Sequence, residues 1–308
     1  MSLLALQGSL ELGIIYAIMA LGVFISFRTL NMPDLTVDSS FTLGAAVSAM
    51  LCTMGHPFLA LPAAMVAGWL AGNVTALLYT KLKIQPLLAG ILVMLGLYSI
   101  NLRVMANRAN IPLLNQPTVF NSLQGTPVEA QTHWLLPLVL LLAVILLLYL
   151  FLQTRFGLVL RATGDNDQMV RAVGVNTNIT ILFGLGLANT LVALSGAMIA
   201  QYQSFADISM GVGMVIIGLA SVIIGEVLFG TSSLLRRLLA VVLGAMLYRL
   251  VIAIALHLGM PPTDLKLVSA IIVTIALSSP VIKEGLMSRQ KRSRSYAHKE
   301  VKDNAGNP

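Results

Sequence analysis

Charged side chains inside long apolar stretches are the first candidates for chemistry in this sequence. Glu226 and Arg249 both lie within segments that are otherwise almost free of charge. A charge at bilayer depth costs several kcal/mol and usually faces a cavity or an ionic partner. Two interpretations are open for this pair: the two side chains bind each other as a structural lock, or they line a solute path.

A second polar group lies at the start of a short apolar segment, in the run Asp34-Leu35-Thr36-Val37-Asp38-Ser39. Either carboxylate can cap the helix that begins here, and capping is compatible with contact to a substrate. A helix N-terminus with unpaired N–H groups can also hold a substrate carboxylate. The predicted substrate-pathway residues are Asn31, Asp34, Thr36, Asp38 and Glu226. Their carboxylates favour a solute that carries an ammonium group.

The long segment 154–178, TRFGLVLRATGDNDQMVRAVGVNTN, is unlike the other connections. Asp165 or Asn166 can cap a short helix over 168–173, and Gly174 can end it in the left-handed conformation. Such a helix is not needed to span a membrane, so we predict that it inserts into another protein. The predicted apolar ridge consists of Met169, Val170 and Val173. The alternative is a solvated, positively charged loop.

The sequence contains no motif for nucleotide binding, metal binding or a disulfide framework. No G-x-x-x-x-G-K-[ST] sequence is present to cradle nucleotide phosphates, so any ATPase must be a separate chain. The four histidines show no metal-ligand spacing, and the single cysteine, Cys52, excludes a disulfide framework within the chain. We therefore expect no catalytic residue, no metal and no cofactor, and a transport subunit rather than an enzyme.

The elements that position these residues are predicted from composition. Of 308 residues, 57% are hydrophobic and 10% are charged, with a mean hydropathy of +0.88, whereas soluble domains are about 25% charged. We predict an all-α polytopic transmembrane helical bundle. About nine apolar segments approach the ~20 residues that a span needs: 9–27, 38–53, 57–79, 84–105, 134–153, 179–201, 212–230, 238–257 and 265–282. The short 38–53 and the glycine-interrupted 212–230 are predicted to be broken or re-entrant helices.

The net charge of +7 is distributed asymmetrically. If every segment crosses, all but four of the 19 lysines and arginines fall on one side; the four are Arg103, Arg108, Arg249 and Lys266. The positive-inside rule then places the C-terminus in the cytoplasm and the N-terminus outside. We assign 1–285 to a permease domain and 286–308 to a basic, disordered tail. That tail is predicted to contact anionic lipid and not nucleic acid.

The sequence RATGDNDQMVRAVGVN resembles the coupling-helix region of permeases for branched-chain amino acids and ribose-type sugars, R-A-x-G-x-N-x-x-A-A-R-x-x-G-I-N. The resemblance implies that this region, 155–178, docks in a groove of an ATP-binding-cassette (ABC) ATPase. Met169 and Val170 replace the Ala-Ala that is usual in the family, which suggests a specialised pairing. The residues predicted to couple to the ATPase are Arg161, Gly164, Asp165, Asn166, Met169, Arg171, Gly174 and Asn176.

Two further blocks are similar to the same family, the one around 34–39 and SGAMIAQYQSFADISMGVGMVIIGLASVIIGEVLFGTSS. Asp38 and Glu226 stand where the family usually has glycine. The form NMPDLTVDSSF resembles a subgroup paired with lipoprotein receptors for aromatic amino acids. The resemblance implies a homodimeric importer permease of the bacterial inner membrane, served by an external binding protein or lipoprotein, for an aromatic or branched-chain amino acid. Alternatives are a sugar or nucleoside permease, and an ion-coupled transporter with Asp34, Asp38 and Glu226 as a proton relay.

Overall fold

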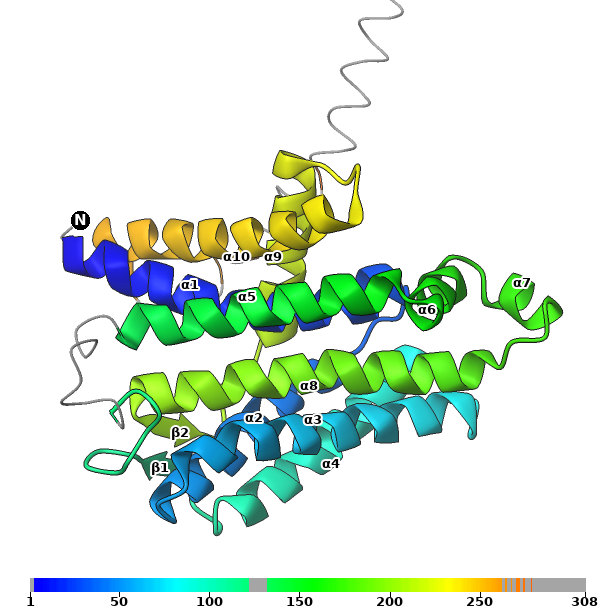
Figure 1. Cartoon of the computed structure of the whole chain (residues 1–308). Helices are drawn as coiled ribbons and strands as arrows, with labels where there is room; N and C mark the ends of the chain where they lie inside the picture. Colours follow the sequence, from blue (N-terminus) through cyan, green and yellow to red (C-terminus); the bar gives the residue numbers. More distant parts are fainter. Residues whose placement is uncertain are drawn as a thin grey trace, which may run out of the picture.

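The structure is a computed structural model that describes residues 3–121 and 132–261, together with 264, 267, 270, 271, 274 and 278. This part of the chain forms a helical bundle (Figure 1). Its helices are α1 (Leu3–Phe24), α2 (Thr36–Thr53), α3 (Pro57–Thr80), α4 (Pro86–Val104), α5 (Thr132–Gln153), α6 (Arg155–Asp165), α7 (Asp167–Ala172), α8 (Thr177–Gln203), α9 (Met214–Phe229) and α10 (Leu234–His257). A π-helix, η1 (Ile25–Thr29), continues α1, and two short strands are β1 (Asn110–Pro112) and β2 (Phe205–Asp207).

Among the described residues, six helices are long and apolar enough to cross a membrane: α1 with η1, α3, α4, α5, α8 and α10. The predicted all-α transmembrane bundle is therefore confirmed. The predicted segments 38–53 and 212–230 are also helical, as α2 and α9. The count of nine spans is not established, because the segment 265–282 falls almost entirely outside the described residues. The tail 286–308 lies outside them as well.

The two segments that the sequence marked as irregular differ from the other apolar helices. Both α2 and α9 begin part-way along the bundle, after the chain has turned back from one of its ends (Figure 1). With 16 residues, α9 is about 24 Å long at 1.5 Å per residue, which is less than a hydrocarbon core of about 30 Å. Each turn passes through the left-handed region, at Asn31 (φ 52°) and at Gly213 (φ 88°).

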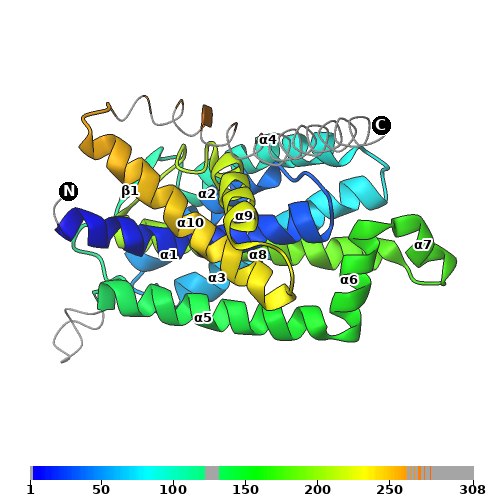
Figure 2. The ribbon, with the colours of Figure 1, turned by 90° about the horizontal axis from the view of Figure 1, so that it is seen from above.

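Burial separates the centre of the bundle from its outer helices. Within the apolar windows of the spans, 83% of α1 and 78% of α8 are buried, against 28% of α4 and 33% of α5. Figure 2 shows α5 on one flank and α4 on another, with α1 and α8 between them. The exposed side chains of α5 include Leu142, Leu146, Leu147 and Leu150. Because these exposed faces are apolar, we expect them to contact lipid rather than water.

Backbone-to-backbone contact holds α2 against α8. A Cβ on Gly44 would lie 1.9 Å from the carbonyl oxygen of Ala193, and one on Gly196 would lie 2.0 Å from that of Phe41. Neither position has room for any side chain. Small residues at such crossings permit dense helix packing, which in lipid depends on van der Waals contact and hydrogen bonds.

A small antiparallel sheet closes the end of the bundle opposite to α6. Ile111 of β1 pairs with Ala206 of β2, and the Asn110 amide donates to Asp207 at 3.3 Å. Partial burial alone would raise the pKa of Asp207, but hydrogen bonds from Ser209 and Asn110 outweigh it and lower that pKa below 3.8. The sequence did not predict this pairing, since strands of three residues carry little pattern.

Candidate functional site

The first turn of α2 is held by Asp34. The buried Asp34 carboxylate accepts the backbone N–H of Thr36 at 2.9 Å and the side-chain amide of Asn189 on α8 at 2.7 Å. The Thr36 hydroxyl shares a 2.7 Å hydrogen bond with that of Thr75 on α3. Asp34 lies one position before the N-cap residue, Leu35, and accepts the first N–H of α2. Through Asn189 it also ties the start of this helix to the centre of the bundle.

Asp38 caps a different helix from the one expected. Its carboxylate lies in the first turn of α2 but accepts the N–H groups of Gly213, at 2.9 Å, and Val215, at 2.8 Å. Those groups belong to the start of α9. The helices α2 and α9 thus meet at their N-terminal ends, and Asp38 provides the acceptor for α9. Helix N-termini carry partial positive charge, so a carboxylate is stabilising there.

Glu226 binds Arg28 and not Arg249. The Arg28 Nε donates to Glu226 Oε2 at 2.8 Å, and Arg28 Nη2 contacts the same oxygen. The predicted Glu226–Arg249 lock is therefore wrong. The observed pair joins η1 to α9, and Glu226 is the better shielded partner, with 8% of its side chain exposed against 56% for Arg28. Arg249 instead lies over the ring of Tyr16.

The five predicted pathway residues form two groups. Asp34, Thr36 and Asp38 come together where α2 meets α9, and all three are hydrogen-bonded to other parts of the protein. Asn31 is exposed and lines a cavity toward α6, and Glu226 is near the end of α9. The sequence did not predict Asn189 as a partner of Asp34 or Thr75 as a partner of Thr36.

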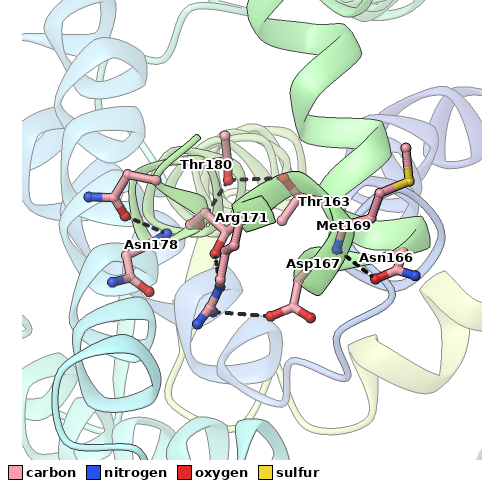
Figure 3. Close-up of polar contacts among 9 residues, drawn as sticks. Thr163, Asn166, Asp167, Met169, Arg171, Asn178 and Thr180 are labelled. Atoms are coloured by element: carbon pink, nitrogen blue, oxygen red, sulfur yellow. Dashed lines mark hydrogen bonds and ion pairs between the residues drawn. The ribbon is translucent and has the colours of Figure 1, made fainter. Parts of the chain in front are cut away.

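The predicted short helix exists as α7. The Asn166 side chain accepts the N–H of Met169 at 3.0 Å, and Gly174 follows the helix with φ 89° (Figure 3). Of the two possible caps, Asn166 is therefore the residue used. Asp165 is exposed at the end of α6. The residues that predicted this helix lie at its two ends in the sequence, and the observed cap and terminating glycine confirm the prediction.

The segment before α7 is helical, which the sequence did not predict. Arg161, Gly164 and Asp165 all lie on α6, whose start is capped by Thr154 through the N–H of Gly157 at 3.1 Å. A Cβ on Gly164 would lie 2.0 Å from the carbonyl oxygen of Thr29. Gly164 is therefore a point of contact between α6 and η1.

The apolar ridge of α7 is narrower than predicted. Met169 and Val173 are 65% and 75% exposed, but Val170 is only 7% exposed and packs inward. Arg171 binds Asp167 at 3.0 Å and donates to the Thr177 hydroxyl at 2.6 Å (Figure 3). Asn176 caps α8 through the N–H of Asn178 at 3.0 Å. Arg171 and Asn176 thus hold the corner between α7 and α8.

Comparison with known proteins identifies the family of this chain. Residues 5–277 match the family described as the permease component of branched-chain amino acid transport systems. The chain belongs to this family. A tyrosine transport system permease protein of Clostridioides difficile is 41% identical over 271 residues, which are 86% of this chain and 88% of the relative. A ribose import permease protein of Escherichia coli is 28% identical over 221 residues, 70% of this chain and 66% of the relative. No solved structure matches the chain.

The chain is thus a transmembrane permease of the ABC importer class, as the resemblance implied. Within the permease, α6 and α7 face the segment that leads to Asp34. A cavity of about 330 Å³ separates them, lined by residues that include Asn31, Tyr79, Gly164, Asn166 and Gln168. Direct contact with η1 is made by α6, where Gly164 lies against the backbone of Thr29.

Proposed function

We propose that this permease imports an amino acid, aromatic or branched-chain, across the bacterial cytoplasmic membrane. The 41% identical relative is named for tyrosine transport, and the family description names branched-chain amino acids. A sugar or nucleoside is the second candidate, supported by the 28% identical ribose permease.

Energy comes, in this proposal, from a separate ABC ATPase that docks on α7. Figures 1 and 2 both show α7 beyond the ends of the long helices, and its exposed Met169 and Val173 give an apolar surface for that contact. Two copies of the chain pair around a central path, and an external binding protein or lipoprotein delivers the solute. The permease itself acts without a cofactor, a metal or catalytic residues.

The proposed orientation places α6 and α7 in the cytoplasm. Basic residues gather at this end of the bundle, at the end of η1, after α3, on α6 and at the start of α10: Arg28, Lys81, Lys83, Arg155, Arg161, Arg171, Arg236 and Arg237. Such an excess marks cytoplasmic loops. The N-terminus and the β1–β2 sheet then face outward, and the basic tail lies inside against anionic lipid.

The contacts suggest how motion is transmitted. Movement of α7 is passed by α6 to η1, because Gly164 packs directly on Thr29. η1 carries Arg28, whose bond to Glu226 holds α9, and it precedes Asp34, which accepts the first N–H of α2. A π-helical turn within an α-helix often marks a functional site. ATP binding would thus shift both broken helices at once and open the path between them.

Co-purification tests the ATPase contact. Met169→Asp combined with Val173→Asp should abolish recovery of the co-expressed ATPase and transport, because both side chains are exposed and their loss removes little internal packing. The matched control is Leu114→Asp, 75% exposed near the opposite end of the bundle, which should retain the ATPase.

Uptake of labelled tyrosine, leucine and ribose identifies the cargo. Uptake that persists without any ATPase would instead support an ion-coupled transporter.

A further inference from the structure

A cavity of about 460 Å³ opens between α1 and α10, toward the ends of these helices that lie away from α6. Both views show α1 and α10 side by side (Figures 1 and 2). Its walls are mainly apolar, and one strong cation, Arg249, enters it. The lining includes Ala5, Gly8, Leu12, Arg249, Ile252 and Leu256. This volume lies in the range of about 300–1,000 Å³ that is usual for small-molecule sites.

Arg249 lines this cavity, one face of its guanidinium is covered by an aromatic ring, and its Nε is buried. Its guanidinium carbon lies 3.8 Å from the centre of the Tyr16 ring, so the aromatic ring stacks on the planar face of the cation. The N–H donors of a guanidinium point outward in its plane. The Arg249 Nε has no hydrogen-bond partner within the described part of the chain.

No carboxylate of the described residues neutralises Arg249. The ion pairs among them are Arg28–Glu226 and Arg171–Asp167. Glu11, the acid on α1, accepts hydrogen bonds from Gln7 at 3.0 Å and from the Tyr202 hydroxyl at 2.7 Å, and it lines a separate cavity. An unneutralised cation on a membrane-spanning helix is costly, and such residues characteristically mark substrate paths.

We propose that this cavity binds the carboxylate of the transported amino acid, with Arg249 as the binding residue and the apolar walls around the substrate side chain. This inference rests on the proposed function and specifies how its substrate is recognised. Guanidinium and carboxylate form two parallel hydrogen bonds, which select a planar anion and reject a neutral group. An amine without a carboxylate, or a sugar, leaves Arg249 unpaired and binds poorly.

A cysteine reporter tests the site without any partner protein. Cys52 is replaced by alanine, and Ala253→Cys places one thiol in the lining, one helical turn beyond Arg249. The permease in lipid nanodiscs is then treated with an anionic sulfonatoethyl or a cationic trimethylammonium methanethiosulfonate. We expect the anionic reagent to react about tenfold faster relative to a free thiol standard, and Arg249→Gln to remove that preference.

Protection by ligands tests the carboxylate itself. L-tyrosine should slow labelling of the Ala253→Cys reporter at least fivefold, whereas tyramine, which lacks the carboxylate, should not. Arg249→Lys keeps the charge, so it should retain the anionic preference but weaken protection by tyrosine, because an ammonium group cannot form the paired bonds. Gly8→Leu fills the cavity from α1, where a Cβ would meet nothing within 4 Å. It should therefore abolish protection in a folded protein.

Three results would overturn the proposal. If the thiol reacts only after denaturation, protein covers the cavity. If the preference for the anionic reagent survives Arg249→Gln, Arg249 does not cause it. If tyrosine and tyramine protect equally, the substrate carboxylate is not what the site recognises. Failure of the proposed function gives a different result. If wild-type cells take up ribose and not amino acids, while the reporter still shows an Arg249-dependent anionic preference, the anion site stands and its assignment to the cargo fails.

Discussion

At the scale of single residues, Asp38 acts as a bridge between two helices. Asp38→Ala leaves the Gly213 and Val215 N–H groups without their acceptor, which should cost about 2–4 kcal/mol, since each unsatisfied buried donor costs about 1–3 kcal/mol. Asp38→Asn keeps one acceptor oxygen and should lose about half as much. Denaturant unfolding in micelles measures the loss, and amide exchange over 213–217 locates it. Equal stability of Asp38→Ala and wild type would contradict the bridge.

The Arg28–Glu226 pair should affect transport more than stability. Arg28 is largely exposed but Glu226 is not, so breaking the pair should cost about 1–3 kcal/mol, whereas uptake should be lost because η1 and α9 no longer move together. The charge swap Arg28→Glu with Glu226→Arg should restore much of the uptake. The two single substitutions, Arg28→Glu and Glu226→Arg, are the controls and should lower uptake, because each leaves two like charges facing each other. Uptake in the charge swap that is no better than in either single variant would contradict the role of the pair.

Residue roles could be predicted only where their partners are local. Asp34 and Asn166 accept the N–H groups of helix starts within three positions of themselves, and the sequence carries that pattern. Asp38 and Gly213 are 175 positions apart, and Arg28 and Glu226 are 198 positions apart. Nothing in the local sequence distinguishes Arg28 from Arg249 as the partner of Glu226. The incorrect pairing therefore arose from missing tertiary information.

At the scale of elements, α7 depends on its cap because it has six residues. Asn166→Ala removes the acceptor for Met169 N–H and should destabilise this helix locally by about 1 kcal/mol. Amide exchange over 167–173 should accelerate about fivefold, with global unfolding unchanged. Asn166→Asp keeps the cap and serves as the control. Faster exchange in the aspartate variant as well would show that the cap does not determine the stability of α7.

Replacement by alanine should change the stability of the protein in opposite directions at two glycines in apolar helices. Gly44→Ala forces a methyl group into the carbonyl of Ala193 and should separate α2 from α8, with a loss of more than about 3 kcal/mol. Gly96→Ala on α4 meets nothing within 4 Å, and the better helix propensity should stabilise the protein by about 0.5–1 kcal/mol. Thermal unfolding of both variants in one detergent gives the comparison, and a shared sign would contradict it.

The apolar pattern predicted the long helices well, because each has enough hydrophobic length to fix its type. It failed for α6, whose 11 residues mix Arg155, Arg161 and Thr163 with apolar positions and resemble a connecting loop. The β1–β2 pairing was equally hidden, since its strands lie nearly a hundred positions apart. Short amphipathic elements need their tertiary contacts before they can be identified.

At the scale of the whole molecule, the proposed orientation makes a direct prediction. Leu114 and Val173 are both 75% exposed and lie near opposite ends of the bundle. With Cys52 replaced, Leu114→Cys should react with a membrane-impermeant maleimide on intact cells, whereas Val173→Cys should react only after the cells are opened. Because exposure is matched, the difference reports sidedness. Labelling of both thiols on intact cells would contradict the proposed topology.

The lipid-facing character of the bundle could be predicted from hydropathy, because the membrane imposes it on the sequence. The sidedness inferred from charge stays a prediction. The arrangement of the helices around α1 and α8 could not be predicted. It depends on contacts such as Gly44 on Ala193 and Gly164 on Thr29. Nothing in the sequence indicates which of the many glycines make such contacts. The position of Arg249 over Tyr16 depends on the same packing.

The meeting of α2 and α9 has a consequence for ion leakage. Two helices that start inside the hydrocarbon region would leave bare N–H groups there and draw in water with the ions that it carries. Asp34 and Asp38 satisfy part of those groups from within the protein. We therefore expect the resting permease to bind few small ions at this depth, so that the membrane potential is preserved between transport cycles. Asp38→Ala should make cells leaky to protons even when no solute is moved.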